Sequence, residues 1–508
     1  MLETCADARV TPRSSKPLGT PRGHCVQKVR VRYRRPTRED RNMDRKPEVI
    51  ELERRETPGK LQGLEDNLRL PAVAPGGDFP IEKLVSEARQ QTHAVGQRAT
   101  RSDCRTHGLG QTKYIADLAL PGMLHAKIKR AGIASAHITR IDTAAAEAMP
   151  GVMAVLIGRD IPVNSFGPSI QDQPLLAHER VFHAGDGVAA VAAVTEQLAA
   201  DAIEKIAVTY EPMPAVFDPM AAMRDDAPKV HPPNSNIYTT KRIAKGDVAK
   251  AFKESYLTLE GRFCTQMVEH ASMEPHAAIA DWDANGRLTI WSTLGRINLG
   301  RADIARTLKL PLNRIRVIGT IVGGNFGGKN EITQEPILAL LAKKSGRPVR
   351  GIFTRDEEFT ATTTRHPFVM EYSTGVSREG HILARTVRLI IDGGAYCSWT
   401  ETTLGKASIL AAGPYRIPNL LIEAFAVYTN KTMTGAMRGF GAPQVCFAYE
   451  SHMDDIANAL GIDPLDIRLR NAFEEGSESP TGQTLHSVVI KDSLLKAAQQ
   501  FGWREARP

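Results

Sequence analysis

The strongest constraint on the fold of this chain is a glycine-rich stretch, VGGNFGGKN, at residues 322–330. An apolar run precedes it and a helical pattern follows it, so the glycines are expected in a turn between a strand and a helix. Backbone N–H groups in such a turn favour an anion. A tight turn without a ligand is the alternative, and four glycines around Phe326 make it the weaker one. The predicted anion-binding residues are Gly323, Gly324, Asn325, Phe326, Gly327, Gly328 and Lys329.

The same stretch matches the first seven positions of a nucleotide-binding P-loop, G-x-x-x-x-G-K, from Gly323 onward. The eighth position of a P-loop is a Ser or Thr whose hydroxyl ligates Mg²⁺, and here it is Asn330. A carboxamide replaces that hydroxyl poorly. The glycine loop therefore favours an anionic cofactor over a nucleotide held with Mg²⁺.

A second glycine loop, GAMRGFGAPQ, occupies residues 435–444. It again places an aromatic residue between glycines with a cation beside them. The residues predicted to bind the ligand here are Arg438, Gly439, Phe440 and Gly441. Two loops of this shape, far apart in the sequence, are expected to converge on one large ligand.

The chain divides into four stretches. Residues 1–95 are rich in charge and proline with little periodicity, and they are expected to form a basic, weakly ordered leader. Residues 96–217 combine short β-rich runs with a helical segment. Prolines and asparagines mark residues 218–245 as a linker, and strands and helices resume over residues 246–508. The predicted fold class is α+β.

Composition narrows the class of protein. With 42% hydrophobic and 24% charged residues, the chain has the balance of a soluble globular protein, and no apolar run is long enough to cross a bilayer. The net charge of +8 includes a dense Lys/Arg series between Lys28 and Arg55. Nucleic acid is one partner that this series could bind, but without interleaved aromatic residues a solvated leader is favoured. No apolar segment follows Arg34 and Arg35 as in a signal peptide, so a cytoplasmic location is expected.

The cysteines and histidines predict no metal site. The six cysteines lack any C-x-x-C pair, which argues against a zinc ribbon, an iron–sulfur cluster or a disulfide framework in this chain. His270 and His276 in EHASMEPH are six residues apart and not four, so they do not match a helical zinc site. Any redox centre is therefore expected on another chain.

The two glycine loops, with RHPF at residues 365–368 and PYRIPN at residues 414–419, resemble the molybdopterin-binding subunit of the xanthine dehydrogenase and aldehyde oxidase family. Residues 96–217, which contain YIADLALPGMLHAKI, resemble the α/β hammerhead domain of that family. Residues 246–508 resemble the first half of its molybdopterin-binding domain. The resemblance leaves the basic leader unexplained.

The resemblance implies oxidative hydroxylation of a small molecule, with a molybdenum–molybdopterin cofactor and water as the oxygen source. The cytosine dinucleotide form of the cofactor is among those that it allows. The 2Fe–2S and FAD centres of the family are expected on partner subunits, an iron–sulfur subunit and an FAD subunit. The loop from Arg438 to Gly441 is expected to bring backbone donors to the metal's ligands, with Arg438 as a catalytic residue. No side chain of this chain is expected to ligate the metal.

On the substrate side the resemblance points to Asn330, Lys406 and Phe440. Lys406 falls where xanthine-oxidising relatives carry an arginine, and Asn330 falls where they carry a glutamate, so purine specificity is not implied. Phe440 matches an aromatic residue that can stack on a planar ring, with core packing as an equal alternative. Val268 falls where some relatives carry a glutamine near the metal. An N-heteroaromatic substrate, xanthine- or nicotinate-like, is favoured over an aldehyde.

One residue of the family has no counterpart here. The general base is a buried glutamate in the second half of the molybdopterin domain, and no residue up to Pro508 matches it. The first interpretation is therefore a subunit of a split enzyme whose second half is a separate chain. The second is a truncated, inactive member of the family. The third, from another class, is a P-loop NTPase or nucleic-acid-binding protein with Leu389–Asp392 as an acidic, metal-binding strand.

Overall fold

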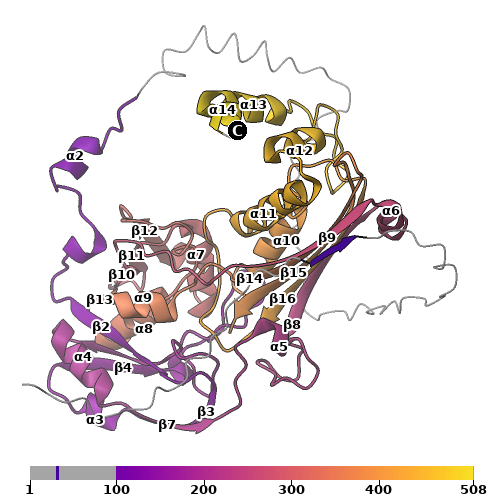
Figure 1. Ribbon diagram of the computed structural model, residues 1–508. Coiled ribbons are helices and arrows are strands. Elements are labelled where there is room, and N and C mark those ends of the chain that lie inside the picture. Colours follow the sequence, from indigo (N-terminus) through magenta and orange to yellow (C-terminus); the bar gives the residue numbers. More distant parts are fainter. Residues whose placement is uncertain (1–29, 34–98, 507–508) are drawn as a thin grey trace, which may run out of the picture. The chain divides into compact units, whose positions relative to one another are not determined.

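The computed structural model describes residues 30–33 and 99–506 (Figure 1). Residues 99–112 belong to a compact unit of their own, which contains α2 (Cys104–Gly108) and an ion pair between Arg101 and Asp103. Residues 30–33 and 113–506 belong to the other unit, and all that follows concerns this second unit. Apart from residues 30–33, the predicted leader at 1–95 lies outside the described residues.

A six-stranded sheet of mixed direction organises the C-terminal part, in the order β1-β9-β14-β15-β16-β8. Its strands are β1 (Arg30–Tyr33), β8 (Ile237–Lys245), β9 (Leu257–Cys264), β14 (Phe368–Val376), β15 (Ile382–Gly394) and β16 (Asn419–Tyr428). Only β15 and β16 run parallel. A parallel pair needs a crossover connection, and α10 (Thr400–Leu410) provides it.

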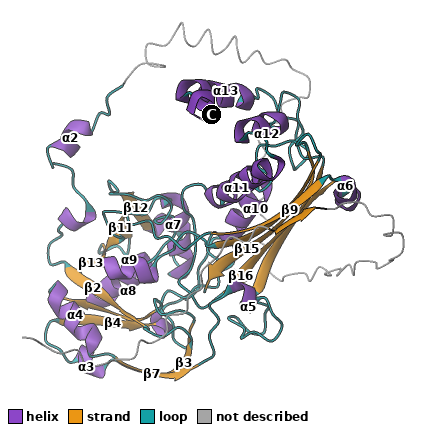
Figure 2. Ribbon diagram, in the orientation of Figure 1, coloured by secondary structure: helices purple, strands orange, loops and turns teal. Residues whose placement is uncertain are grey.

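Helices α10 and α11 (Ala442–Leu460) lie along one face of this sheet (Figure 1, Figure 2). They share a buried core with strand residues such as Phe263, Met370 and Leu389. The opposite face carries α5 (Pro219–Ala222), whose Ala222 packs with Ile390. The remaining helices around this sheet are α6 (Val248–Glu254), α12 (Pro464–Asn471), α13 (Ile490–Phe501) and α14 (Trp503–Ala506).

A seven-stranded sheet organises the other part of the unit, in the order β12-β11-β10-β13-β2-β6-β4. Its strands are β2 (Leu124–Arg130), β4 (Val152–Ile157), β6 (Gly187–Ala193), β10 (Ala277–Trp282), β11 (Leu288–Ser292), β12 (Ile315–Gly319) and β13 (Val349–Ile352). Strand β2 pairs with β13, with Leu124 opposite Val349. Strands from both sides of the predicted linker therefore share one sheet, and the sequence division does not separate two bodies in space.

Helices cover this second sheet as well. They are α3 (Ala144–Glu147), α4 (Glu196–Glu204), α7 (Ile297–Thr307), α8 (Glu335–Ser345) and α9 (Arg355–Ala361), and a small sheet of β5 (Arg180–Val181), β3 (Ala136–Asp142) and β7 (Ala207–Pro212) lies beside them. Local sequence explains their ends. The Thr195 hydroxyl accepts a hydrogen bond from the Leu198 amide and starts α4, and Gly346, at a φ of +66°, ends α8. The α+β class predicted from the sequence is confirmed.

Two expectations from the sequence are corrected. The predicted linker at 218–245 includes β8, because the prolines and asparagines that discourage a strand end just before Ile237, and β8 is an edge strand. Residues 30–33 of the leader form β1, in agreement with their alternating Val and Arg.

One cysteine differs from the sequence interpretation. Cys264 is disulfide-bonded, which the scattered spacing did not predict, while Cys104, Cys397 and Cys446 are free. Among the helices of residues 99–506, none has the length and apolar character that a membrane crossing requires.

Candidate functional site

The first glycine loop follows β12 and has a conformation that its own residues impose. The Asn325 carboxamide oxygen accepts the amides of Gly327 at 2.9 Å and Lys329 at 3.1 Å. Gly324 and Gly327 both have a φ of +111°, where L side chains are strained, and Phe326 lies between them at +50°. Phe326 is 51% exposed. The glycines therefore allow a tight turn that presents backbone and an aromatic ring outward.

The second glycine loop follows β16 and runs into the first turn of α11. Gly439, Phe440 and Gly441 all have positive φ, at +104°, +48° and +84°. A side chain at Gly441 would stand 2.8 Å from Ala407 and 3.0 Å from the Thr403 carbonyl, so the loop lies directly on α10. The second loop is thus fixed against the helix that carries Lys406.

The structure brings the two loops together, as the sequence predicted. The Arg438 amide donates to the Phe326 carbonyl at 2.8 Å. A side chain at Gly327 would stand 2.4 Å from the Ala436 carbonyl oxygen. The two backbones can approach this closely only because position 327 is glycine.

Backbone donors from both loops have no acceptor within the part of the chain that the structure describes. They are the amides of Gly324, Asn325, Phe326, Gly439 and Gly441. Backbone N–H groups are strong donors that seldom stay unpaired unless water or a ligand accepts from them. The two loops therefore fit an extended, anionic group such as a pterin cofactor.

Lys329 differs from the expectation that it would offer its charge to an anion. Its ammonium is buried and donates to the Glu274 carbonyl at 2.7 Å, with the Glu274 carboxylate at 3.4 Å. Burial lowers the pKa of Lys329, and the Glu274 charge opposes that shift only in part. Glu274 also accepts the Gly323 amide at 2.7 Å. Lys329 therefore holds the base of the loop in place and does not face a ligand.

The P-loop alternative fails on the same geometry. A P-loop lysine must reach phosphate at the start of a helix, whereas α8 begins only at Glu335 and Lys329 bonds to Glu274. The acidic strand proposed with it ends in Asp392, which is fully buried and paired with Lys431 at 2.9 Å. Neither group is free to bind a nucleotide–Mg²⁺ complex.

EHASMEPH is a support for both loops and not a metal site. The His270 Nε2 donates to the Ala436 carbonyl at 2.8 Å, and the His276 Nε2 lies 3.1 Å from the Gly328 carbonyl. Over residues 99–506, no cluster of side chains has the composition of a metal site. The sequence interpretation missed this supporting role, because it tested the two histidines only against the residue spacing of a helix, and the segment is not helical.

Arg365 is a second support that the sequence marked only as part of RHPF. Its guanidinium donates to the Arg438 carbonyl at 3.1 Å and to the Gln444 side chain at 3.4 Å. Its amide donates to the Val268 carbonyl at 2.7 Å. Arg365 therefore links the second loop to α11 and to the end of the segment that holds the histidines. The Arg438 side chain itself is exposed.

The predicted substrate residues lie around these loops without ion pairs among the described residues. Lys406 is exposed on α10, one residue before the Ala407 that the second loop touches. Phe440 is half-buried in the second loop, and Asn330 is half-buried at the end of the first. Their contact with a substrate stays a prediction.

Glu331 is a residue that the sequence interpretation passed over. Its carboxyl accepts a hydrogen bond from the Ser398 hydroxyl, and a side chain at Gly435 would stand 2.9 Å from that hydroxyl oxygen. Burial raises the pKa of Glu331 to about 7, which the Ser398 hydrogen bond offsets only in part. Glu331 thus connects the end of the first loop with the start of the second.

The raised pKa of Glu331 gives a testable pH dependence of stability. Because the folded chain keeps this proton up to about pH 7 and the unfolded chain loses it near pH 4.5, the free energy of unfolding should fall as pH rises through that window. The contribution is at most about 3 kcal/mol. Glu331→Gln keeps the hydrogen bond and removes the titration. Urea unfolding at pH 5 and pH 8 should show a smaller loss for the variant than for the wild type, and equal losses would contradict the assignment.

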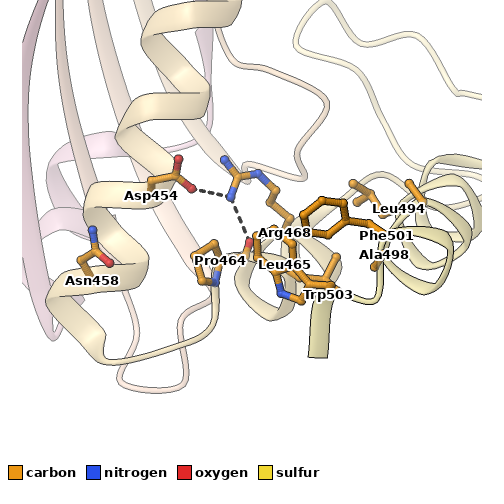
Figure 3. A pocket seen from close by; sticks show the side chains of 10 residues that line it. Asp454, Asn458, Pro464, Leu465, Arg468, Leu494, Ala498, Phe501 and Trp503 are labelled. Carbon is orange, nitrogen blue, oxygen red and sulfur yellow. Dashed lines mark hydrogen bonds and ion pairs between the residues drawn. The ribbon is translucent and has the colours of Figure 1, made fainter. Parts of the chain in front are cut away.

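A cavity of about 620 Å³ lies apart from the loops, where α12 faces α13 (Figure 3). Leu465, Leu494 and Phe501 give it an apolar wall, and Arg468 crosses it to Asp454 at 2.7 Å. None of the predicted site residues lines it. The candidate site is therefore the pair of loops and not this cavity.

Comparison with known proteins identifies the domains of this chain, and both glycine loops fall within one of them. Residues 230–472 match the family described as "Molybdopterin cofactor-binding domain", and residues 109–214 match "Aldehyde oxidase and xanthine dehydrogenase, a/b hammerhead domain". The predicted hammerhead domain followed by the first part of a molybdopterin-binding domain is confirmed. The limits predicted for these domains, 96–217 and 246–508, stay predictions.

Individual relatives give the extent of the match. The nicotinate dehydrogenase large molybdopterin subunit of Eubacterium barkeri is 36% identical over 81% of this chain and 98% of its own length. A probable xanthine dehydrogenase subunit of Bacillus subtilis is 38% identical over 79% of this chain and 55% of its own. The structure of the aldehyde oxidoreductase from Desulfovibrio gigas matches with a TM-score of 0.78 and 31% identity, over 80% of this chain and 46% of the other. The chain spans about half the length of the latter two proteins. It belongs to the family of molybdopterin-binding subunits of the xanthine dehydrogenase and aldehyde oxidase type.

Proposed function

We propose that the two glycine loops bind molybdopterin and that this chain is a subunit of an oxidoreductase that hydroxylates an N-heteroaromatic ring with water as the oxygen source. The observation that carries the proposal is the meeting of the loops: the Arg438 amide bonds to the Phe326 carbonyl at 2.8 Å, and unpaired amides surround this contact. The proposed cofactor residues are Gly323 to Lys329 and Arg438 to Gly441, with Lys329 acting through its hold on Glu274.

The bound cofactor supplies the oxygen transfer and accepts the electrons of the oxidation. The residues of this chain bind and orient it. Amides of Gly439 and Gly441 are fixed donors, and such donors stabilise charge that develops during a reaction without reorganising. Arg438 adds an exposed cation beside them, which is its proposed catalytic contribution.

The proposed substrate is a planar ring held by Lys406, Asn330 and Phe440. A lysine and a carboxamide leave one cation and no carboxylate at this side, which suits an electron-rich or anionic substituent on the ring. The relatives named for nicotinate and xanthine support an N-heteroaromatic substrate. An aldehyde is the second candidate, because a solved relative is an aldehyde oxidoreductase.

The proposed partners are an iron–sulfur subunit with a 2Fe–2S centre, an FAD subunit and a chain that carries the second half of the molybdopterin domain with the general-base glutamate. A relative matched over 98% of its length is itself named as a subunit, which supports the split enzyme over the truncated, inactive alternative. The cytosine dinucleotide form of the cofactor and the cytoplasmic location stay predictions.

The test is to isolate this chain from its native host under mild conditions. We expect molybdenum and pterin at about one per chain, together with a second chain homologous to the C-terminal half of the longer relatives. Turnover of nicotinate, xanthine, quinoline and aliphatic aldehydes by that complex then separates the substrate candidates. Isolation of the chain alone, without metal or pterin, would favour the inactive alternative, and oxidation of aldehydes only would exclude the heteroaromatic substrate.

A further inference from the structure

The hydrogen bonds of His276 determine its protonation state. This side chain is buried, with 4% of the residue exposed. Its Nδ1 lies 2.8 Å and 3.1 Å from the two Glu358 carboxylate oxygens, and its Nε2 lies 3.1 Å from the Gly328 carbonyl oxygen. Carboxylate and carbonyl oxygens only accept hydrogen bonds. Both ring nitrogens are therefore placed to donate, which is the hydrogen-bonding pattern of an imidazolium.

Glu358 has the matching charge. It is 1% exposed on α9 and also accepts the His276 backbone amide at 2.6 Å. Burial acts to raise the pKa of Glu358, but the hydrogen bonds and charge of His276 outweigh it and leave the pKa below its usual range. The carboxylate is therefore ionised at neutral pH, and the two residues form a buried ion pair at the end of the first loop.

His270 contrasts with His276 within the same segment. Its Nε2 donates to Ala436, while its Nδ1 has no hydrogen-bond partner among the described residues. Burial lowers the pKa of His270, so this ring is neutral. Its Nδ1 also stands 2.9 Å from where a side chain at Gly328 would lie. One histidine thus holds the second loop and packs on the first, and the other holds the first loop by a charged hydrogen bond.

The other charged groups near His276 come from three elements. Glu331, at the end of the first loop, interacts with His276, and Lys329 interacts with Glu358. Further out, Glu269 interacts with His270, and Arg355 at the start of α9 interacts with Lys329. Lys329 is neutralised by Glu274, and the Arg355 guanidinium donates to the carbonyls of Ser272 and Met273. None of these groups replaces the contact of Glu358 with Nδ1.

We propose that His276 and Glu358 are positioning residues that act as a permanently ionised pair, fixing the Gly328 carbonyl and so the spacing of the two loops. The pair acts on the loops through the Gly328 carbonyl. Without the carboxylate, His276 can donate from both ring nitrogens only while the solvent keeps it protonated, because a neutral ring donates from one nitrogen only. The order of the loop then becomes dependent on pH.

The direct test is the protonation state of His276 in the full chain. NMR of the wild-type chain with ¹⁵N-labelled histidine, assigned by comparison with His276→Gln, should show two protonated ring nitrogens from pH 6 to pH 8. A ring that is neutral at pH 7 would overturn the proposal. Because this measurement is made on the wild-type chain, it does not depend on whether a Glu358 variant folds.

The second test is hydrogen exchange of residues 325–331 in Glu358→Gln, corrected for the intrinsic pH dependence of exchange. We expect wild-type protection at pH 6 and about tenfold faster exchange at pH 8, as the loss of one charged hydrogen bond implies. Glu357→Gln is the matched control, since Glu357 on the same helix pairs with Arg130 at 3.0 Å and touches neither loop. Exchange in Glu358→Gln that is equally fast at both pH values would show a merely structural role.

A role of this pair in cofactor binding rests on the proposed function. The proposal for the pair and the proposed function can nevertheless fail separately. Hydrogen exchange of the loop is measured on the chain without any cofactor, so it reports the effect of the His276–Glu358 pair alone. Molybdenum per chain in the native complex reports the proposed function. We expect Glu358→Gln to lose molybdenum when the complex is held at pH 8 and to keep it at pH 6. If exchange of the loop in Glu358→Gln becomes faster at pH 8 while the complex keeps its molybdenum at that pH, the pair does not position the cofactor site.

Discussion

Replacing Gly327 with alanine should weaken binding of molybdenum and pterin by the native complex about a hundredfold and so lower their content, since strain of a few kcal/mol falls directly on the meeting of the two loops. The φ of +111° disfavours any L side chain, and the new Cβ would stand 2.4 Å from the Ala436 carbonyl oxygen. Backbone on both sides has to move apart, which breaks the bond from the Arg438 amide to the Phe326 carbonyl. Metal analysis and pterin fluorescence of the purified complex measure the result.

Gly346→Ala is the matched control for this prediction. Gly346 also has a positive φ, at +66°, but nothing lies within 4 Å of a side chain built there. The control therefore carries a backbone penalty of about 1 kcal/mol without a clash, and it should keep its cofactor. A complex that retains full cofactor with Gly327→Ala would place the cofactor site elsewhere.

Lys329→Met should lower the free energy of unfolding by about 3 kcal/mol, because it removes one partner of a buried ion pair and leaves the other charge. The Glu274 carboxylate keeps the Gly323 amide as a donor but loses the ammonium, and its second oxygen already has no hydrogen-bond partner among the described residues. Urea unfolding followed by tryptophan fluorescence measures the loss.

The double variant Lys329→Met, Glu274→Gln separates this cause from simple packing. A carboxamide can still accept the Gly323 amide and carries no charge, so the double variant should recover most of the stability lost by the single one. If the two variants are equally unstable, the loss comes from packing of the lysine stem and the buried charge has no part in it. A single variant within about 0.5 kcal/mol of wild type would show that the pair contributes little.

Local signals in the sequence predicted the elements well. The short β-rich runs and the helical segment predicted within residues 96–217 depend on neighbours a few residues away, and the structure has β2, β4, β6 and α4 there. The paired glycine loops were also predicted, because their residue types are unusual wherever they occur.

The parts that the sequence did not predict depend on contacts between distant residues. Lys329 was expected to face an anion, and its direction is set by Glu274, which lies in another stretch of the chain. The roles of His276 and Glu331 depend likewise on Glu358 and Ser398. Spacing along a sequence measures neighbours within a helix or strand, and it cannot identify a partner that only the tertiary fold supplies.

The pairing of β2 with β13 has a consequence for synthesis of the chain on the ribosome. Leu124 emerges more than two hundred residues before its partner Val349, so until β13 appears, β2 is an open edge next to β6. Open edges invite pairing with other chains, and long-range pairings form slowly. The hammerhead region therefore cannot complete its sheet as it leaves the ribosome. One edge of β2 stays unpaired until β13 is synthesised, and β13 follows both the first glycine loop and α8 in the sequence.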